Sequence, residues 1–277
     1  MDLSTLTTEQ RNPATARIDQ LDTLSMLNLI NEEDKKAALA VERVLPDIAR
    51  AVDLITSKIT EGGRLFYIGA GTSGRLGVLD ASECPPTFGV SPHLVQGIIA
   101  GGVRALVNSL EGAEDNRERA ISDLEERNFS TGDVLVGIAA SGRTPYVLSG
   151  LEYAKSLDAS TIAVSCVEKS EAAALADIAL TPVTGAEVIT GSTRMKAGTA
   201  TKMVLNMLTT ATMIKLGKVC GNLMVDVRAT NDKLKDRARR IVMEATGCSS
   251  ERAIEALKAS DGYAKAAIEL IMSSKND

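Results

Sequence analysis

A turn rich in glycine and hydroxyl residues is the first stretch of the sequence that could do chemistry. It follows the apolar run Leu65–Ile68, which has the length and β-rich composition of a buried parallel strand. The turn reads GAGTSG, and a predicted helix begins at Arg75. Glycines let the backbone approach a ligand, and the free N–H groups and dipole of a helix N-terminus favour an anion. The pattern therefore predicts a phosphate site, to which Thr72 and Ser73 would add hydroxyl donors.

The same arrangement occurs a second time. The predicted strand Asp133–Ala139 is followed by Ser141, Gly142, Arg143 and Thr144, and then by a predicted helix over 146–157. Each glycine-rich turn by itself could also be an ordinary turn that binds no ligand. Together they are stronger evidence, because the carboxyl ends of parallel strands form one ligand-binding edge of a sheet.

Two carboxylates are candidates for proton transfer. Glu83 comes just before Pro85 and Pro86, in a segment that the two prolines should stiffen, and Glu114 lies in an acidic turn. Paired carboxyl groups in different environments can act as an acid and a base. Other interpretations stay open, since Glu83 also fits an exposed helix-end carboxylate and Glu114 also fits a cap for the helix predicted from Arg117.

A further polar segment, GAEVITGSTRMKAGTATK, spans residues 185–202. Its hydroxyls include Ser192 and Thr193. Arg194 and Lys196 fit either structural ion pairs or ligand contacts. Glu187 fits either a third site carboxylate or a buried helix cap.

The elements that must position these residues alternate between strands and helices. This order predicts an α/β fold, a parallel sheet between two layers of helices. We expect a helical segment over 1–63, the sheet domain over 64–227 and a small three-helix bundle over 228–277. The five predicted strands are Leu65–Ile68, Leu94–Ala100, Asp133–Ala139, Thr161–Ser165 and Ile178–Thr181.

The first 63 residues are predicted to be mainly helical, with the leucines of the first short helix on one face. A short helix over 25–30 is predicted, then a turn or cap over 31–34, then a long helix. Pro46 should either kink this long helix or start a second helix in its first turn.

Composition narrows the class of protein. The chain has 277 residues, a formal net charge of −5, one histidine and four scattered cysteines. An acidic chain argues against a nucleic-acid partner, and one histidine argues against a histidine zinc site. Dispersed cysteines, no secretory pattern in Met1–Arg11 and no run of membrane-spanning length predict a cytoplasmic protein that does not bind a membrane. The apolar helix predicted over 203–216 and the long N-terminal helices predict a homodimer.

These motifs resemble a known family. The two glycine and serine loops resemble the sugar isomerase (SIS) domain, which binds phosphosugars. The 185–202 segment resembles the signature shared by N-acetylmuramic acid 6-phosphate etherases and the glucokinase regulatory protein. The stretches DASECPPTFG, LEGAEDN and QRNPAT resemble the etherases more narrowly, and the resemblance covers nearly the whole chain.

The resemblance implies a lyase that removes the lactyl ether of N-acetylmuramic acid 6-phosphate by elimination and water addition, in peptidoglycan recycling, with no metal or organic cofactor. It implies that Glu83 donates a proton to the departing lactate and that Glu114 is the base. The substrate, a small phosphosugar, would be bound by Thr72, Ser73, Ser141, Gly142, Arg143, Thr144, Ser192 and Thr193. An aldose–ketose isomerase, which needs no acid such as Glu83, and a non-catalytic phosphosugar sensor are the alternatives on this fold.

Overall fold

The computed structural model describes residues 7–226 and 232–273, and of residues 232 and 233 the backbone only. The chain forms two compact units. The first comprises residues 1–82 and 93–209, and the second residues 83–92 and 210–277. The predicted domain boundary at 227/228 lies outside the described residues, and the predicted three-part division stays a prediction.

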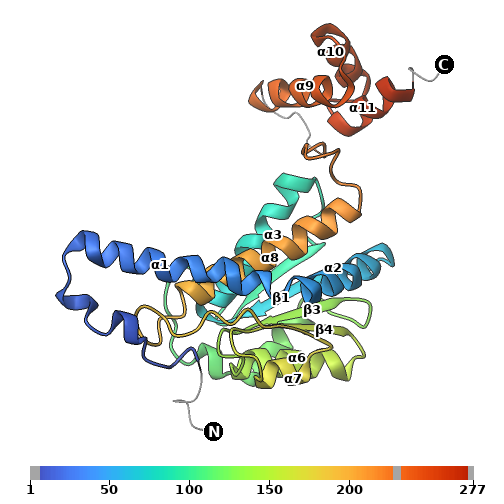
Figure 1. Cartoon of the computed structure of the whole chain (residues 1–277). Helices are drawn as coiled ribbons and strands as arrows, with labels where there is room; N and C mark the ends of the chain where they lie inside the picture. Colours follow the sequence, from blue (N-terminus) through green and yellow to red (C-terminus); the bar gives the residue numbers. More distant parts are fainter. Residues whose placement is uncertain (1–6, 227–231, 274–277) are drawn as a thin grey trace. The chain divides into compact units, whose positions relative to one another are not determined.

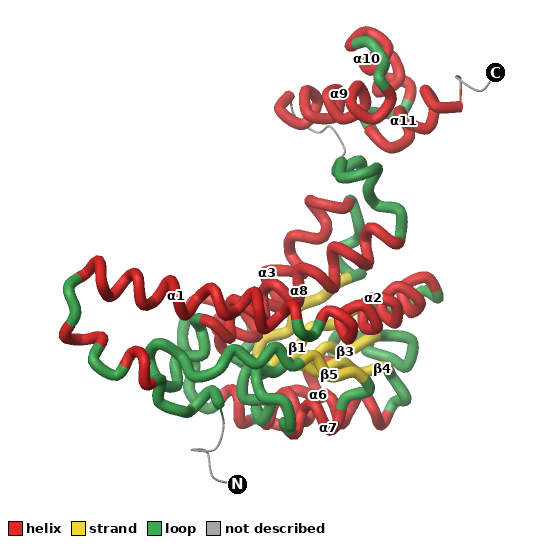
Figure 2. Tube along the Cα trace, in the orientation of Figure 1, coloured by secondary structure: helices red, strands yellow, loops and turns green. Residues whose placement is uncertain are grey.

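A five-stranded parallel sheet forms the centre of the first unit (Figure 2). The strand order is β2-β1-β3-β4-β5. The strands are β1 (Leu65–Gly69), β2 (Val95–Ile99), β3 (Val134–Ile138), β4 (Ser160–Val164) and β5 (Ile178–Leu180). The predicted fold class is confirmed, and each predicted strand is confirmed to within one residue at either end, because each is a short apolar run bounded by turns.

Alternate residues of β1 serve the two faces of this sheet. Phe66 and Ile68 belong to a buried cluster with residues of α5 (Arg117–Glu125), α6 (Pro145–Ser156) and α7 (Glu171–Leu175). Tyr67 points to the other face, where its hydroxyl donates to Asp80 of α3 (Gly71–Phe88) at 3.0 Å. Figure 1 shows α6 and α7 on one side of the strands and α2 (Leu45–Thr60), α3 and α8 (Lys196–Lys215) on the other.

Asp80 joins α3 to α8 on this second face of the sheet. It accepts hydrogen bonds from Asn206 at 2.6 Å and from Thr209 at 3.2 Å, in addition to the one from Tyr67. Burial raises the pKa of Asp80, and the hydrogen bonds from Asn206, Tyr67 and Thr209 oppose that rise. The buried, hydrogen-bonded carboxylate of Asp80 therefore joins β1, the strand that precedes the first loop, to α3 and α8.

The N-terminal helices differ in part from the prediction. The turn or cap predicted over 31–34 is wrong, because α1 runs without a break over Thr23–Glu42. The polar residues of that stretch are accommodated by ion pairs one turn apart, Glu32 with Lys35 and Glu33 with Lys36. Pro46 starts a second helix, as one of the two predicted options required, since it is the second residue of α2.

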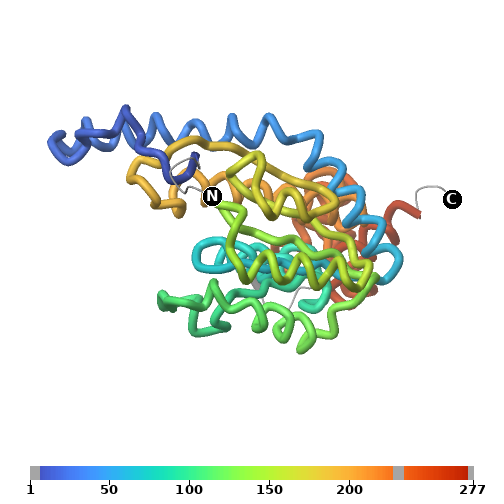
Figure 3. The backbone as a smooth tube through the Cα atoms, turned by 90° about the horizontal axis from the view of Figure 1, so that it is seen from below, coloured from blue at the N-terminus to red at the C-terminus, as the bar shows by residue number. Residues whose placement is uncertain are grey.

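The part of the segment before α1 that the structure describes, residues 7–22, contains two short 3₁₀ helices, η2 (Pro13–Thr15) and η3 (Ile18–Gln20). The side chain of Asn12 caps η2 by accepting from the N–H of Ala14 at 3.0 Å. Asn12 also donates to the carbonyl of Ala186 at 3.3 Å, and Thr15 donates to the carbonyl of Val188 at 2.8 Å. Figures 1 and 3 both show this segment alongside the chain that leads into α8.

Three helices make up the main part of the second unit, as predicted. They are α9 (Asp232–Thr246), α10 (Ser250–Ala259) and α11 (Ala264–Ser273). Small and aliphatic side chains, among them Val242, Ala253 and Ile268, form their common core. No helix among residues 7–226 and 232–273 is long and apolar enough to cross a membrane.

Candidate active site

The two predicted phosphate loops leave the sheet from neighbouring strands. β1 pairs with β3, with Gly69 opposite Ile138, and β1 pairs on its other side with β2. The chain therefore changes direction across the sheet between β1 and β3. Ligands of open parallel sheets bind at such a switch point, outside the carboxyl ends of the strands. Both loops are at this edge.

The first loop is a very tight connection between β1 and α3. A methyl group added to Gly69 would lie 2.7 Å from the nitrogen of Gly74, and one added to Gly74 would lie 2.6 Å from the carbonyl oxygen of Gly69. Gly71 has a φ of +52°, which favours glycine. Glycines thus bring the strand and the helix together, and Thr72 and Ser73 lie half-buried in the first turn of α3.

The second loop is held from α7. Gly142 has a φ of +65°, and a methyl group there would lie 2.2 Å from Cβ of Ser170. Ser141 and Thr144 are half-buried, and Thr144 is the N-cap residue of α6 but makes no side-chain capping bond. The Nε atom of Arg143 lies 3.3 Å from Oε1 of Glu171. Its Nη1 is buried and has no hydrogen-bond partner among the described residues, which leaves a donor available for an anionic ligand.

The turn that carries Ser192 and Thr193 lies beside the first loop. A methyl group added to Gly198, in the first turn of α8, would lie 3.5 Å from Cγ2 of Thr72 and 3.4 Å from the carbonyl oxygen of Thr193. The N–H of Gly198 donates to that same carbonyl at 2.9 Å. The structure therefore brings Thr193 and Thr72 to one place.

Glu187 and Lys196 have structural roles in the first unit. Oε2 of Glu187 accepts from the N–H of Lys196 at 3.1 Å, and Oε1 accepts from the N–H of Ala197 at 2.9 Å. Glu187 is 1% exposed, so of its two predicted roles the buried helix cap is the one observed. Lys196 forms a buried ion pair with Glu33.

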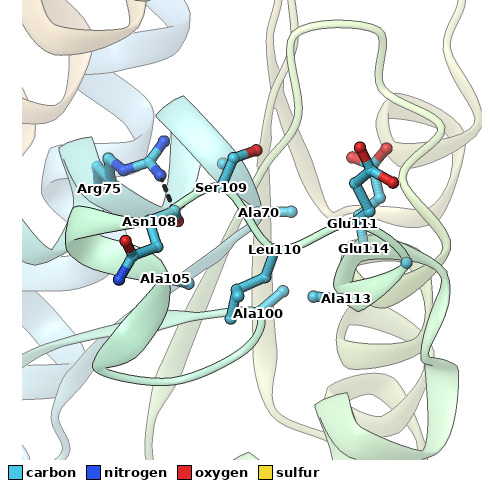
Figure 4. A pocket seen from close by; sticks show the side chains of 12 residues that line it. Ala70, Arg75, Ala100, Ala105, Asn108, Ser109, Leu110, Glu111, Ala113 and Glu114 are labelled. Atoms are coloured by element: carbon cyan, nitrogen blue, oxygen red, sulfur yellow. Dashed lines mark hydrogen bonds between the residues drawn. The ribbon is translucent and has the colours of Figure 1, made fainter.

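Glu114 lines a pocket of about 200 Å³ together with Gly71 of the first loop (Figure 4). It lies on η4 (Ala113–Asp115), just before α5. The cap of α5 is Asn116, whose Oδ1 accepts from the N–H of Arg119 at 2.9 Å, so Glu114 is not needed for capping. The structure thus places Ala70 and Gly71 of the first loop and the exposed carboxylate of Glu114 in one pocket.

Arg75 is a pocket residue that the sequence did not single out. Its Nε donates to the carbonyl of Leu106 and its Nη2 to the carbonyl of Asn108, both at 3.0 Å, and Figure 4 shows the second bond. These bonds fasten the end of α4 (Arg104–Val107) to the start of α3. The only sequence signal is a basic residue at the start of the predicted helix, a place where the helix dipole favours anions.

Glu83 lies in α3, which continues through Pro85 and Pro86 to Phe88, so the predicted segment with the two prolines is the last part of a helix. Glu83 is exposed, belongs to the second unit and does not line the pocket of Glu114. It comes ten residues after Ser73 in the same helix.

Comparison with known proteins decides the family. The chain is 61% identical over 273 residues to an N-acetylmuramic acid 6-phosphate etherase of Vibrio vulnificus, covering 99% of this chain and 91% of the relative. It belongs to the N-acetylmuramic acid 6-phosphate etherase family. The etherases of Photobacterium profundum and Clostridium beijerinckii are 60% and 58% identical, over 98% and 100% of this chain and 90% and 91% of their own lengths.

Domain models and solved structures agree with the fold. Residues 47–155 match the glucokinase regulatory protein N-terminal SIS domain, and residues 118–211 match the SIS domain. A putative phosphosugar isomerase of Bacteroides fragilis has a TM-score of 0.54 at 24% identity, covering 69% of this chain and 92% of that one. A phosphoheptose isomerase of Neisseria gonorrhoeae has a TM-score of 0.51 at 16% identity, over 72% and 100%. At these identities the likeness concerns the fold alone.

Proposed function

We propose that this protein cleaves the lactyl ether of N-acetylmuramic acid 6-phosphate, giving N-acetylglucosamine 6-phosphate and D-lactate. The observation that carries the proposal is the pocket shared by Glu114 and Gly71, because it puts a carboxylate beside the turn suited to a phosphate. Membership of the etherase family supplies the substrate class. The reaction would take part in the recycling of peptidoglycan sugar, and it would occur in the cytoplasm.

The chemistry we propose is that of a carbon–oxygen lyase. Direct displacement at an ether is difficult, whereas elimination is accessible from the open-chain sugar. A base removes the hydrogen from the carbon beside the aldehyde, and the electron pair forms a double bond as the carbon–oxygen bond to lactate breaks. An acid protonates the departing oxygen, and water then adds to the unsaturated aldehyde. Each positioned proton transfer contributes about 10²- to 10⁴-fold in rate.

We assign the base to Glu114 and the acid to Glu83. The phosphate would be held at the start of α3 and by the loop after β3, with Arg143 offering its unpartnered Nη1. The residues proposed to bind the substrate are Thr72, Ser73, Ser141, Gly142, Arg143 and Thr144, with Ser192 and Thr193 beside them.

We also propose that the active protein is a homodimer. Leucines of α1 remain strongly exposed, with Leu24 at 68%, Leu27 at 55% and Leu39 at 53%. Apolar side chains gathered on one helix favour burial against a partner.

Two carboxamide variants test the assignment of roles. The protein is incubated with N-acetylmuramic acid 6-phosphate in deuterated water, and both lactate release and deuterium incorporation beside the aldehyde are followed. Glu114→Gln should abolish incorporation, whereas Glu83→Gln should retain some incorporation and lose lactate release. The reverse pattern would exchange the roles. Wild-type protein that binds the phosphosugar without releasing lactate would indicate a sensor, and aldose–ketose conversion without lactate would indicate an isomerase.

A further inference from the structure

An apolar patch lines part of the pocket that holds Glu114, and the roles proposed so far make no use of it. Four alanines and one leucine form this patch, namely Ala70, Ala100, Ala105, Leu110 and Ala113. The patch and Glu114 both belong to the first unit. Figure 4 shows Leu110 and Ala113 in the lower part of the view, with the carboxyl group of Glu114 above them.

Side chains of the apolar patch meet around one point, next to Gly101. A methyl group added to Gly101 would lie 2.9 Å from Cδ1 of Leu110 and 3.2 Å from Cβ of Ala105. Cβ of Ala113 would lie 3.4 Å from the same methyl group. Ala100 belongs to the buried cluster beneath α5 and α6, and Ala113 packs against that cluster. The core of the sheet domain therefore supports the patch from behind.

Leu110 is the large side chain of the apolar patch. It is 36% exposed although it contacts the alanines around it, and it lines the pocket. Removing apolar surface from water is favourable in proportion to the area covered. An apolar group placed in the pocket would therefore gain free energy by covering Leu110.

The charges around the pocket are unfavourable for an anionic group. Glu111 and Glu114 both line it, and Arg75 is the one cation among the described residues that do so. Nε and Nη2 of Arg75 already donate to the backbone carbonyls of Leu106 and Asn108. A second anion here would meet two like charges. The hydroxyl residues proposed to bind the phosphosugar do not line this pocket, so the phosphate has its place outside it.

The position of the proposed base restricts which part of the substrate lies near the patch. Glu114 would remove a hydrogen from the carbon beside the aldehyde, and in N-acetylmuramic acid 6-phosphate the same carbon carries the acetamido group. A base in reach of that hydrogen has its oxygen about 3 Å away. The acetamido methyl lies about 3.8 Å from the carbon, because the two are related like successive Cα atoms across a trans amide. The methyl group must therefore lie close to the base.

We propose that the apolar patch receives the acetamido methyl group of the substrate, and that Leu110 sets the size of the acyl group that the site accepts. The acetamido group is neutral and ends in a methyl group. The other methyl group of the substrate belongs to the lactyl group and shares its carbon with a carboxylate, which Glu111 and Glu114 would repel. The inference rests on the proposed function, and it makes Leu110 a residue that sets specificity at the acyl group.

Two substrates that differ only in the acyl group test this inference. The second substrate carries an N-butanoyl group in place of the N-acetyl group, which adds two methylene groups. Wild type should prefer the N-acetyl substrate by about tenfold or more in kcat/KM, because the added methylenes meet the wall that Leu110 forms. Leu110→Ala removes three carbon atoms from that wall, so this preference should fall by about tenfold. Leu110→Met keeps the volume of the side chain and should keep the preference.

The matched control is Val107→Ala. Val107 is an aliphatic residue of α4 three positions before Leu110, but it is 83% exposed and does not line the pocket. This variant should keep the wild-type preference between the two substrates. Circular dichroism checks that all the variants keep their helix content.

The outcomes separate the inference from the proposed function. Wild-type protein that releases no lactate from the natural substrate overturns both. If wild type releases lactate but uses the two substrates equally well, the function stands and the role of the apolar patch is wrong. The same conclusion follows if Leu110→Ala loses equally on both substrates, because a merely structural role would affect them alike.

Discussion

The ammonium of Lys196 lies 2.6 Å from Oε2 of Glu33, and the two side chains are 1% and 3% exposed. The other oxygen of Glu33 accepts from Lys36 at 2.6 Å. This pair joins the middle of α1 to the first residue of α8, immediately after the turn with Ser192 and Thr193. An ion pair buried to this degree contributes to stability chiefly through the cost of breaking it.

Glu33→Gln should therefore lower the free energy of unfolding by about 3 kcal/mol, because the ammonium of Lys196 stays buried without its counter-charge. Urea denaturation at neutral pH measures the difference. The matched control is Glu32→Gln, which breaks the exposed pair with Lys35 on the same helix and should cost about 0.5 kcal/mol or less. Similar losses in the two variants would show that burial of the Glu33 pair has no special weight.

The stability difference between wild type and Glu33→Gln should depend on pH. Burial acts to raise the pKa of Glu33, but the hydrogen bonds from Lys196 and Lys36 outweigh it, so the pKa lies below its ordinary value of 4.5. A depressed carboxyl pKa contributes stability that is present above the ordinary value and is lost as the pH falls through the folded-state value. Urea curves below pH 4.5 should therefore converge. A constant gap down to the acid transition would contradict this account.

The strands and two of the helices show how much of the fold the sequence predicts. The strands were predictable because each is an apolar run between turns. The break predicted in α1 was wrong because Asn31 and Asp34 resemble a turn locally, whereas Glu33 is held by Lys196, 163 residues away. The start of α8 was predicted at Met203 and lies at Lys196. Glu187 caps that earlier start, and no local periodicity reveals such a contact.

The candidate site also has parts that the sequence predicts and parts that it does not. The two loops could be predicted because strand, glycine turn and helix follow one another in sequence. The closeness of Glu114 to Gly71 depends on β2 lying next to β1, and a sequence of alternating strands and helices does not state that order. Arg75 donates hydrogen bonds to backbone carbonyls, and because every residue has a carbonyl, the sequence does not indicate these contacts. Glu83 is exposed near the end of α3, as its interpretation as a helix-end carboxylate expects.

Replacing Glu187 should affect both stability and substrate binding. Glu187→Ala leaves the N–H groups of Lys196 and Ala197 buried without their acceptor, at a cost of about 1 to 3 kcal/mol. Because this cap holds the turn of Ser192 and Thr193 beside Thr72, KM for the phosphosugar should rise. The control is Ser249→Ala, which removes the cap of α10 in the other unit and should cost about 1 kcal/mol without changing KM. An unchanged KM in Glu187→Ala would limit its role to stability.

Gly142→Ala tests the second phosphate loop. The new methyl group would lie 2.2 Å from Cβ of Ser170 at a φ of +65°, so the loop that carries Ser141 and Thr144 must shift. Binding of N-acetylglucosamine 6-phosphate, measured by calorimetry, should weaken by about tenfold or more, as expected for the loss of one charge-assisted hydrogen bond. Gly62→Ala is the matched control, because Gly62 also has a positive φ, +94°, but nothing lies within 4 Å of its added methyl group.

The second change that tests this loop is Ser170→Gly in the Gly142→Ala background. It removes the two atoms nearest to the new methyl group, Cβ and Oγ of Ser170, the latter at 2.3 Å. Glycine is tolerated at the N-cap position that Ser170 occupies in α7, at a cost of a few tenths of a kcal/mol. The double variant should therefore recover much of the lost affinity. Equal weakening in Gly142→Ala and Gly62→Ala, or no recovery in the double variant, would show that the contact with Ser170 does not set the shape of the phosphate loop.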